Sequence, residues 1–311
     1  MHITHTVSPQ EDGMTLHALL RGPLHLTAGQ TRTAKAKGAV TVDAAPFFAN
    51  QPVRCGMVVR VALCGYEGNM PPLPPDLPPV RVLYEDDALL AVYKPALLQC
   101  HPSSSAPGGS DTLEARVQAY LRAGAHPVHR LDAETTGIVL FAKLPYAQAH
   151  LQRQMQAGGF QKRYEAWACG VPRPAQGEVD APIAPTSPGS FTRAVCPQGQ
   201  RAVSRYRVLR TLTRPSGGEI VSLLSLAPVT GRTHQLRVHM AHIGCPLLGD
   251  TRYGTTDSLA LSRALGVPHH QLCAVELRFA HPLSGQAIRI ACDAAFSPGV
   301  GEFPGFFPLT I

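Results

Sequence analysis

An aspartate in a polar turn is the strongest candidate for chemistry in this sequence. Asp132 follows Arg130 and Leu131, and Thr135, Thr136 and a glycine lead from it into the apolar run of residues 138–143. A carboxylate at such a place can act as a nucleophile or as a base, as in the cleavage of glycosidic bonds. An aspartate that only caps the turn through bonds to backbone N–H groups is the alternative.

Two arginines and a tyrosine can assist a carboxylate of this kind. Arg232 and Arg237 lie five residues apart in a segment that looks helical after its opening turn, so they would point in different directions. A guanidinium opposite a carboxylate favours its charged form, whereas apolar surroundings disfavour it. The ring of Tyr164 can stack on a planar group, and its hydroxyl can carry a proton. Solvated arginines and a tyrosine in a core strand are the alternatives.

The elements around these residues predict an α+β fold rather than a regular βαβ alternation, because β-rich runs alternate with two or three amphipathic helices. One helix is predicted over residues 111–124 with Asp111 as its N-cap, and another over 145–159, opened by Pro145 and closed by Gly158. The predicted strands are residues 80–86, 88–95, 162–171, 201–210, 219–228, 272–282 and 287–293.

A proline-rich stretch divides the chain. Residues 68–79 contain six prolines in twelve positions, a density that excludes both helix and interior strand. We therefore expect a stiff linker at residues 66–79, a small α/β module at 1–65 and a larger domain at 80–311.

The composition predicts a soluble protein and permits a polyanionic partner. Hydrophobic residues make up 44 % of the chain, and no apolar run approaches the roughly 20 residues that span a bilayer. We read no export signal at the start, so we expect a cytoplasmic protein, and a monomer. The net charge of +7 permits binding to nucleic acid. The eight cysteines are scattered without a CxxC pair, which predicts core residues rather than a zinc site.

Four stretches together resemble the RluA-type family of pseudouridine synthases. They are KPALLQCHP from Lys94, HRLDAETTGIVLFAK from His129, KRYEAW from Lys162 and GRTHQLRVHMAHIGCPLLGDTRYG from Gly231, and the resemblance covers nearly all of residues 80–290. It implies a catalytic domain with a mixed, mostly antiparallel sheet and flanking helices. It also implies an isomerase that converts uridine to pseudouridine in structured RNA, with no metal and no organic cofactor.

The resemblance implies a role for each matching residue. Asp132 would be the essential carboxylate, Arg237 its partner, and Tyr164 the residue that stacks on the base and moves a proton. Arg130 would fill the gap that an extruded uridine leaves, with a phosphate contact as the rival role. Leu236 would pack against Tyr164 and exclude water, unless it is ordinary helix core.

Other positions fit the family pattern less simply. Arg232 would contact the RNA backbone. The histidines of these motifs, at positions 129, 234 and 239, are expected to make structural hydrogen bonds rather than transfer protons. Leu97 stands where the family commonly has glycine, which leaves the local loop conformation open.

Residues 13–64 resemble the small alpha-L RNA-binding domain that often precedes this catalytic domain. Arg32, Lys35 and Lys37 would be its phosphate-facing charges, on one side of a helix. A solvated helix face without a partner is the alternative.

The expected substrate is structured RNA, with 23S ribosomal RNA favoured and transfer RNA as the alternative. A non-catalytic ribosome-assembly factor that kept the fold is a second hypothesis, and the joint presence of Asp132, Tyr164 and Arg237 argues against it. A nucleoside hydrolase-like enzyme is a third, and it would need an acidic metal or water site that the sequence does not contain.

Overall fold

The computed structural model describes residues 1–66, 74, 76–102, 111–214, 218–294, 296, 303 and 305–308. The predicted linker at 66–79 falls mostly outside these residues. The helices are a short 3-10 turn at Pro9–Glu11, α1 (Leu16–Arg21), α2 (Ala28–Ala36), α3 (Leu113–Leu121), α4 (Pro145–Gln156), α5 (Gln235–His242) and α6 (Thr256–Ala264). None of the helices that the structure describes is both long and apolar enough to cross a membrane.

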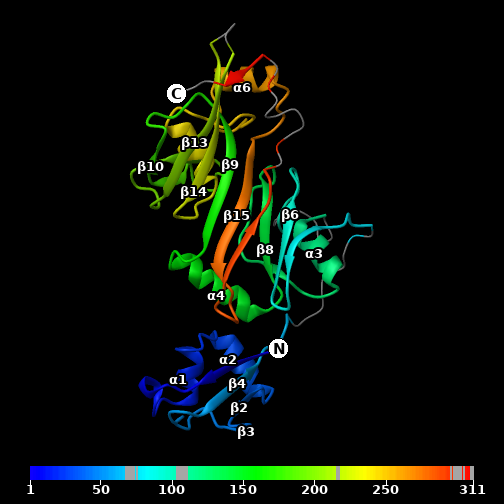
Figure 1. The fold of residues 1–311 in the computed structure, drawn as a ribbon, viewed down its shortest axis with the longest axis vertical. Helices are drawn as coiled ribbons and strands as arrows, with labels where there is room; N and C mark the ends of the chain where they lie inside the picture. Colours follow the sequence, from blue (N-terminus) through cyan, green and yellow to red (C-terminus); the bar gives the residue numbers. More distant parts are fainter. Residues whose placement is uncertain are drawn as a thin grey trace.

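The first strands of the chain form a small sheet of their own, with the order β1-β4-β2-β3. These strands are β1 (His2–Thr6), β2 (Val40–Val42), β3 (Ala45–Pro46) and β4 (Val58–Ala62). Together with α1 and α2 they make a separate unit at one end of the molecule (Figure 1). Its apolar core includes Leu19, Leu20 and Val59, and Tyr146 of α4 packs against that core from the larger domain.

The larger domain is built on one long sheet with the order β10-β13-β14-β9-β15-β8-β6-β5. All these neighbours are antiparallel except β8 and β15, so the sheet is mixed and mostly antiparallel, as expected. Its strands are β5 (Arg81–Glu85), β6 (Leu89–Lys94), β8 (Thr136–Ala142), β9 (Gln161–Cys169), β10 (Gln176–Asp180), β13 (Val203–Thr213), β14 (Ile220–Pro228) and β15 (Leu272–Ala280). Shorter strands pair at its margins or apart from it: β7 (His126–Pro127), β11 (Ile183–Pro185), β12 (Arg193–Val195), β16 (Ala287–Ala291) and β17 (Phe307–Pro308).

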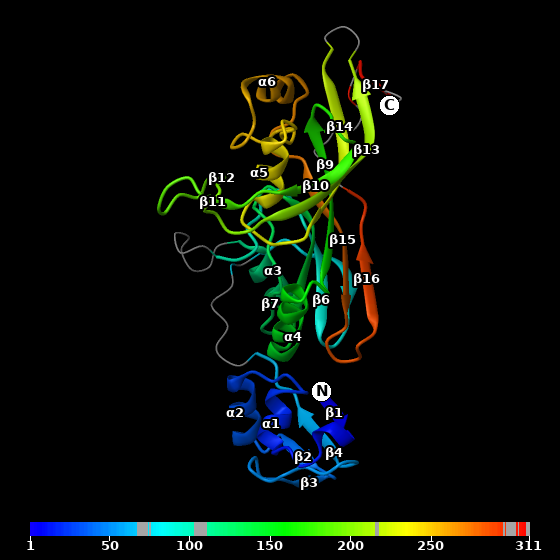
Figure 2. The same ribbon diagram turned by 90° about the vertical axis from the view of Figure 1, so that its left-hand side faces the viewer.

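Helices α3, α4 and α5 lie on the same side of this sheet (Figure 2). The largest buried apolar cluster of the described residues lies beneath α3 and α5 and includes Val117 of α3, Leu236 and Met240 of α5, and Tyr164 of β9. Helix α4 packs on a second cluster through Ala147 and Leu151. The first cluster fixes α5 against the sheet, and this position decides where the polar residues just before and after it can point.

The predicted ends of the two helices agree with the structure except at the N-cap of α3. Helix α4 begins at Pro145 and is followed by Gly158 with a φ of 78°, as predicted. Helix α3 is capped by Thr112, whose side chain accepts from the Ala115 N–H at 3.2 Å, so the prediction of Asp111 as N-cap was wrong. Asp111 instead accepts two hydrogen bonds from Arg116.

Gly137 makes the parallel pairing of β8 and β15 possible. It pairs with Ala274 and has a φ of 109°, a conformation that favours glycine. A Cβ atom at this position would lie 2.2 Å from the Ala274 carbonyl oxygen. The two backbones therefore approach one another only because residue 137 has no side chain.

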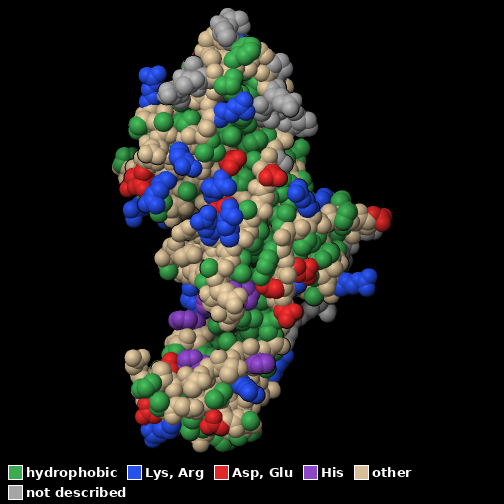
Figure 3. Space-filling model, viewed as in Figure 1, with side chains coloured by type: hydrophobic (Ala, Val, Ile, Leu, Met, Phe, Trp, Pro, Cys, Tyr) green, Lys and Arg blue, Asp and Glu red, His purple; other side chains and the backbone are tan. Residues whose placement is uncertain are grey.

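Histidines gather where the N-terminal unit meets the larger domain (Figure 3). The ring centroids of His25, from the N-terminal unit, and His150, from α4, lie 6.4 Å apart. Burial lowers the pKa of both imidazoles, and the charge of Arg153 lowers it further. The surroundings at this junction therefore favour the neutral forms of His25 and His150.

Candidate active site

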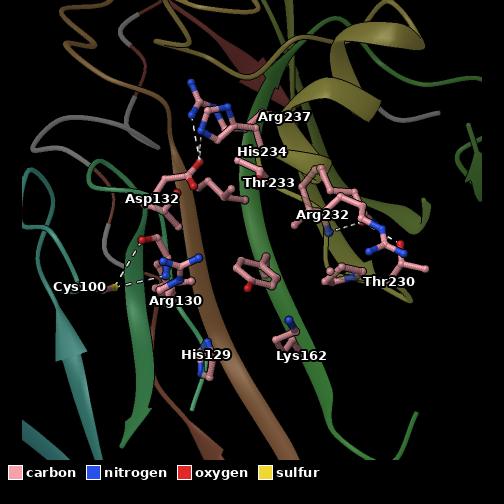
Figure 4. A pocket seen from close by; sticks show the side chains of 18 of the residues that line it. Cys100, His129, Arg130, Asp132, Lys162, Thr230, Arg232, Thr233, His234 and Arg237 are labelled. Atoms are coloured by element: carbon pink, nitrogen blue, oxygen red, sulfur yellow. Dashed lines mark hydrogen bonds and ion pairs between the residues drawn. The ribbon is translucent and has the colours of Figure 1, made fainter. Parts of the chain in front are cut away.

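A cleft of about 820 Å³ opens on the helical side of the sheet, in the size range of small-molecule sites. It is lined by the loop before β8, by β9, by the end of α4 and by the segment from β14 into α5. Asp132, Tyr164 and Arg237 all line it, although 105 residues separate Asp132 from Arg237. Figure 4 shows Asp132 and Arg237 next to one another at one end of the cleft. The fold thus gathers the three residues that the sequence singled out.

Asp132 lies in the loop between β7 and β8, and 29 % of its side chain is exposed to the cleft. The Arg237 Nη1 group donates a hydrogen bond of 3.0 Å to its Oδ2 atom. The Nε2 atom of His234 lies 3.8 Å from the same oxygen. The carboxylate thus accepts a charge-assisted hydrogen bond from the guanidinium, and it remains open to a ligand.

Arg237 is held in place from behind by a second carboxylate. Its Nε and Nη2 groups donate to the two oxygens of Asp250, each at 2.8 Å, and the Asp250 side chain is completely buried. Burial alone would raise the pKa of Asp250, but the hydrogen bonds and charge of Arg237 hold it below its ordinary value. The ring of Tyr253 covers the guanidinium at 5.1 Å. Arg237 thus bridges a buried acid and an accessible one.

No role was predicted for Asp250, although it stands in the GDTRYG part of the motif that begins at Gly231. Gly249 just before it has a φ of 76°, and a Cβ atom there would lie 2.1 Å from the His269 carbonyl oxygen. The Gly-Asp pair is the available signal, because the glycine lets the chain turn tightly enough for the next carboxylate to point inward.

Lys94 supports the loop of Asp132 from the other side. It is completely buried, and its Nζ group donates to the carbonyl oxygens of Pro95, Leu98 and Ala133 at 2.9, 2.8 and 2.6 Å. The three acceptors satisfy the three N–H donors of an ammonium group. Burial lowers the pKa of Lys94 to about 8. Lys94 therefore connects its own loop, through Pro95 and Leu98, to the backbone of Ala133 next to Asp132.

Leu97, in the same loop, adopts a φ of 64° and leaves 73 % of its surface exposed. This backbone conformation is one that glycine adopts without strain, which accounts for glycine being common at this position of the motif. The loop therefore has the left-handed conformation that suits glycine, although the residue at this position is a leucine.

Tyr164 belongs both to the core and to the cleft. It is 6 % exposed and lies in the buried cluster with Leu236, which is also 6 % exposed. Both residues line the cleft as well. Burial raises the pKa of the Tyr164 hydroxyl well above its usual range, and the charge of Asp132 adds to the effect. The phenol therefore stays protonated and can donate a hydrogen bond.

Comparisons with known proteins identify this arrangement. The sequence pattern of the RNA pseudouridylate synthase family matches residues 88–242. A ribosomal large subunit pseudouridine synthase D from Nitrosomonas europaea is 36 % identical over 257 residues, which are 80 % of this chain and 72 % of that protein. The chain belongs to the RNA pseudouridylate synthase family. Its relatives place it in the RluA-type branch.

Other relatives agree with this membership. A protein of the same name from Haemophilus influenzae is 38 % identical over 67 % of this chain, which spans 65 % of that protein's length. An uncharacterized RNA pseudouridine synthase from Mycobacterium bovis is 32 % identical over 84 % of this chain and 86 % of its own. The solved structure of human RNA Pseudouridylate Synthase Domain Containing 4 superposes with a TM-score of 0.53 at 27 % identity, over 69 % of this chain and 88 % of its own.

Two arginines of the family motifs lie at the rim of the cleft. Arg130 is exposed, and its Nη1 group lies 2.8 Å from the Nε2 atom of His101. Arg232 is also exposed, and its Nε group donates to the Arg201 carbonyl oxygen at 3.0 Å. Helical spacing was expected to make Arg232 and Arg237 point in different directions, but Arg232 precedes α5 and is not on the helix. The direction of Arg232 is set by the loop before α5.

The histidines of the family motifs have different surroundings. His239 is completely buried between the Ser204 hydroxyl and the Ala181 carbonyl, each at 2.9 Å. The Nδ1 atom of His234 lies 2.7 Å from the Tyr253 hydroxyl. Burial lowers the pKa of His129 to about 3, and the charge of Lys162 adds to the effect. His129 is therefore neutral at physiological pH.

The basic residues of the N-terminal unit do not reach the cleft. Arg32 and Lys35 are exposed on α2, and Lys37 is exposed at its C-terminal end. The Nζ atom of Lys35 lies 3.1 Å from the Nδ1 atom of His17. All three belong to the N-terminal unit, which lies below the larger domain in Figure 1.

Proposed function

We propose that this chain converts uridine to pseudouridine within structured RNA. The observation that carries the proposal is the Asp132 carboxylate at an open cleft, 3.0 Å from a guanidinium that a buried acid holds in place. The names of the relatives support the same activity for this chain. This chain spans 65 % of the length of the Haemophilus influenzae relative, so the proposed activity rests on the site as well as on the likeness.

The reaction breaks the bond between C1′ of the ribose and N1 of uracil and forms a bond between C1′ and C5. The proton on C5 is lost and N1 gains one, so the product is an isomer of the substrate. Asp132 attacks the base, attacks the anomeric carbon, or assists a glycal intermediate; each route needs the carboxylate charged. Arg237 keeps it so.

The remaining residues of the cleft handle the extruded nucleotide. Tyr164 stacks on the uracil and donates a hydrogen bond from a hydroxyl that stays protonated. Leu236 closes the apolar side of the pocket. Arg130, exposed at the rim, fills the gap that the uridine leaves and offsets part of the few kcal/mol that extrusion costs. Arg232 contacts the RNA backbone at the opposite rim.

The favoured substrate is the RNA of the large ribosomal subunit, because two of the relatives described above are named for it. Transfer RNA is the alternative substrate. The N-terminal unit would add affinity through Arg32, Lys35 and Lys37 as a tethered RNA-binding module. We further propose that the protein acts as a monomer in the cytoplasm.

One experiment tests the activity against its rivals. Large-subunit ribosomal RNA transcribed with uridine tritiated at C5 is incubated with the protein, and tritium in water and free uracil are both measured. Isomerisation releases tritium, binding alone releases none, and hydrolysis yields free uracil. Asp132→Asn should fold, bind the RNA and release only background tritium. Wild-type turnover by this variant would refute the role of Asp132.

A further inference from the structure

The cleft has a second polar end, away from Arg237 (Figure 4). Lys162 lies there on β9, together with His129, Phe160 and the last residues of α4. The mechanism proposed above uses no residue at this end.

The side chain of Lys162 has no hydrogen bond and no ion pair with any residue in the described part of the chain, although its backbone pairs with Leu277 in the sheet. Its neighbour Arg163, by contrast, donates to Glu165 at 2.7 Å. Asp132 is the only carboxylate among the described residues that line the cleft, and Arg237 already engages it. His129 is neutral and offers no charge. Lys162 is thus a cation in the cleft wall without a counter-charge.

Burying a charged ammonium group without a partner is energetically unfavourable. Burial lowers the pKa of Lys162, which means that the surroundings disfavour its charged form. An anion that enters the cleft would reverse this effect, because it would supply both the charge and the acceptors that the ammonium group lacks. The site is therefore suited to an anionic group of the substrate.

The position of Lys162 relative to Tyr164 identifies that group. Two residues along one strand place both side chains on the same face, about 7 Å apart. If a uracil stacks on Tyr164, the nearest anions are the phosphates on either side of its nucleotide. We infer that Lys162 binds a backbone phosphate adjacent to the extruded uridine, an assignment that rests on the proposed function.

The phosphate contact is tested by the salt dependence of RNA binding. Lys162→Met is compared with Lys162→Arg and with Arg163→Met, a control that removes the next cation on the strand. Each phosphate contact contributes about 0.7 to 0.9 to the slope of log affinity against log salt. Lys162→Met should weaken binding of the tritiated large-subunit transcript and reduce the slope by about one such step. Lys162→Arg and Arg163→Met should keep the wild-type slope.

A neutral backbone provides the second measurement. Once the modified uridine is mapped, a short RNA is made with a methylphosphonate at either flanking phosphate. One of the two replacements should weaken binding to the wild-type protein and have no further effect on Lys162→Met. This test with the wild-type protein stands even where the variant folds poorly.

The outcomes separate this inference from the proposed function. Loss of turnover in Lys162→Met with unchanged affinity and slope would overturn it, since the lysine would then act on the base. The same slope change in Arg163→Met, or no effect of either methylphosphonate, would also overturn it. If Lys162→Met lowers the salt slope as predicted but the wild-type protein releases no tritium, the proposed function is refuted and the phosphate contact remains supported.

Discussion

Asp250 and Arg237 form a bidentate ion pair, with two hydrogen bonds of 2.8 Å. This pair leaves the Nη1 group of Arg237 for Asp132, at 3.0 Å. One arginine thus joins an acid that water does not reach to an acid that faces the cleft. The buried acid fixes the direction in which the arginine points, and the arginine holds the accessible carboxylate in place by a hydrogen bond.

We expect Asp250→Asn to lower both stability and activity. Breaking one side of a buried ion pair costs about 3 to 5 kcal/mol, because the remaining charge is left without its partner. Turnover should fall together with the melting temperature, since Arg237 is then free to turn away from Asp132. The matched control is Glu178→Gln, which removes an exposed ion pair with Arg205 of 2.9 Å and should cost at most about 1 kcal/mol. Equal effects of the two changes would contradict the positioning role.

Lys94 predicts a pH dependence of stability. Its pKa is about 8 in the folded protein and 10.5 in a model peptide, so the unfolded chain binds more protons between these values. The free energy of unfolding therefore rises with pH in this range. The contribution of Lys94 to it is fully present above pH 10.5, where the amine is neutral in both states, and is lost as the pH falls through 8. Denaturant unfolding of the wild type and of Lys94→Met at pH 7.5 to 10.5 measures the difference. The wild type should gain, relative to the variant, about 3 kcal/mol over this window. A constant difference would refute the lowered pKa.

Tyr164→Phe should separate stacking from proton transfer. The phenylalanine ring keeps the stacking surface, so RNA affinity should stay close to that of the wild type. Turnover should fall roughly 100-fold or more, because the hydroxyl is lost. Tyr164→Leu removes both features and should weaken binding as well. A fully active Tyr164→Phe would show that the hydroxyl takes no part in the reaction.

Gly137→Ala should destabilise the fold much more than an alanine at another left-handed glycine. The new Cβ atom would lie 2.2 Å from the Ala274 carbonyl oxygen, so β8 and β15 would have to separate, at a cost of about 3 kcal/mol or more. Gly158 has a φ of 78° and no atom within 4 Å of its Cβ position, so Gly158→Ala should cost only about 1 to 2 kcal/mol. Thermal or urea unfolding compares the two variants, and similar losses would contradict the importance of the close approach.

The N-terminal unit should act through affinity and not through chemistry. Replacing Arg32, Lys35 and Lys37 together by glutamine should reduce the salt slope of RNA binding by about 2. Turnover at saturating RNA should remain that of the wild type, because these residues lie outside the cleft. A loss of turnover that saturating RNA does not restore would show that the unit also positions the substrate.

Much of the local structure could be predicted from the sequence. Residues 145–159 carry a helix because Pro145 and Gly158 mark its ends, and α4 spans Pro145–Gln156. The cap of α3 was misplaced by one residue, because aspartate and threonine are both good caps and stand next to each other. The choice between them depends on the Ala115 N–H, whose position no local pattern gives.

The sequence by itself determined the family, and it predicted Asp132 as the reactive carboxylate because of its place in the motif. Only the tertiary structure decided the surroundings of the other polar residues near the cleft. Asp250, Lys94 and Lys162 differ in burial and in partners, and those depend on which strands become neighbours across the sheet. Strand neighbours are set by long-range packing, which acts between residues far apart in the chain and leaves no periodic trace in the sequence.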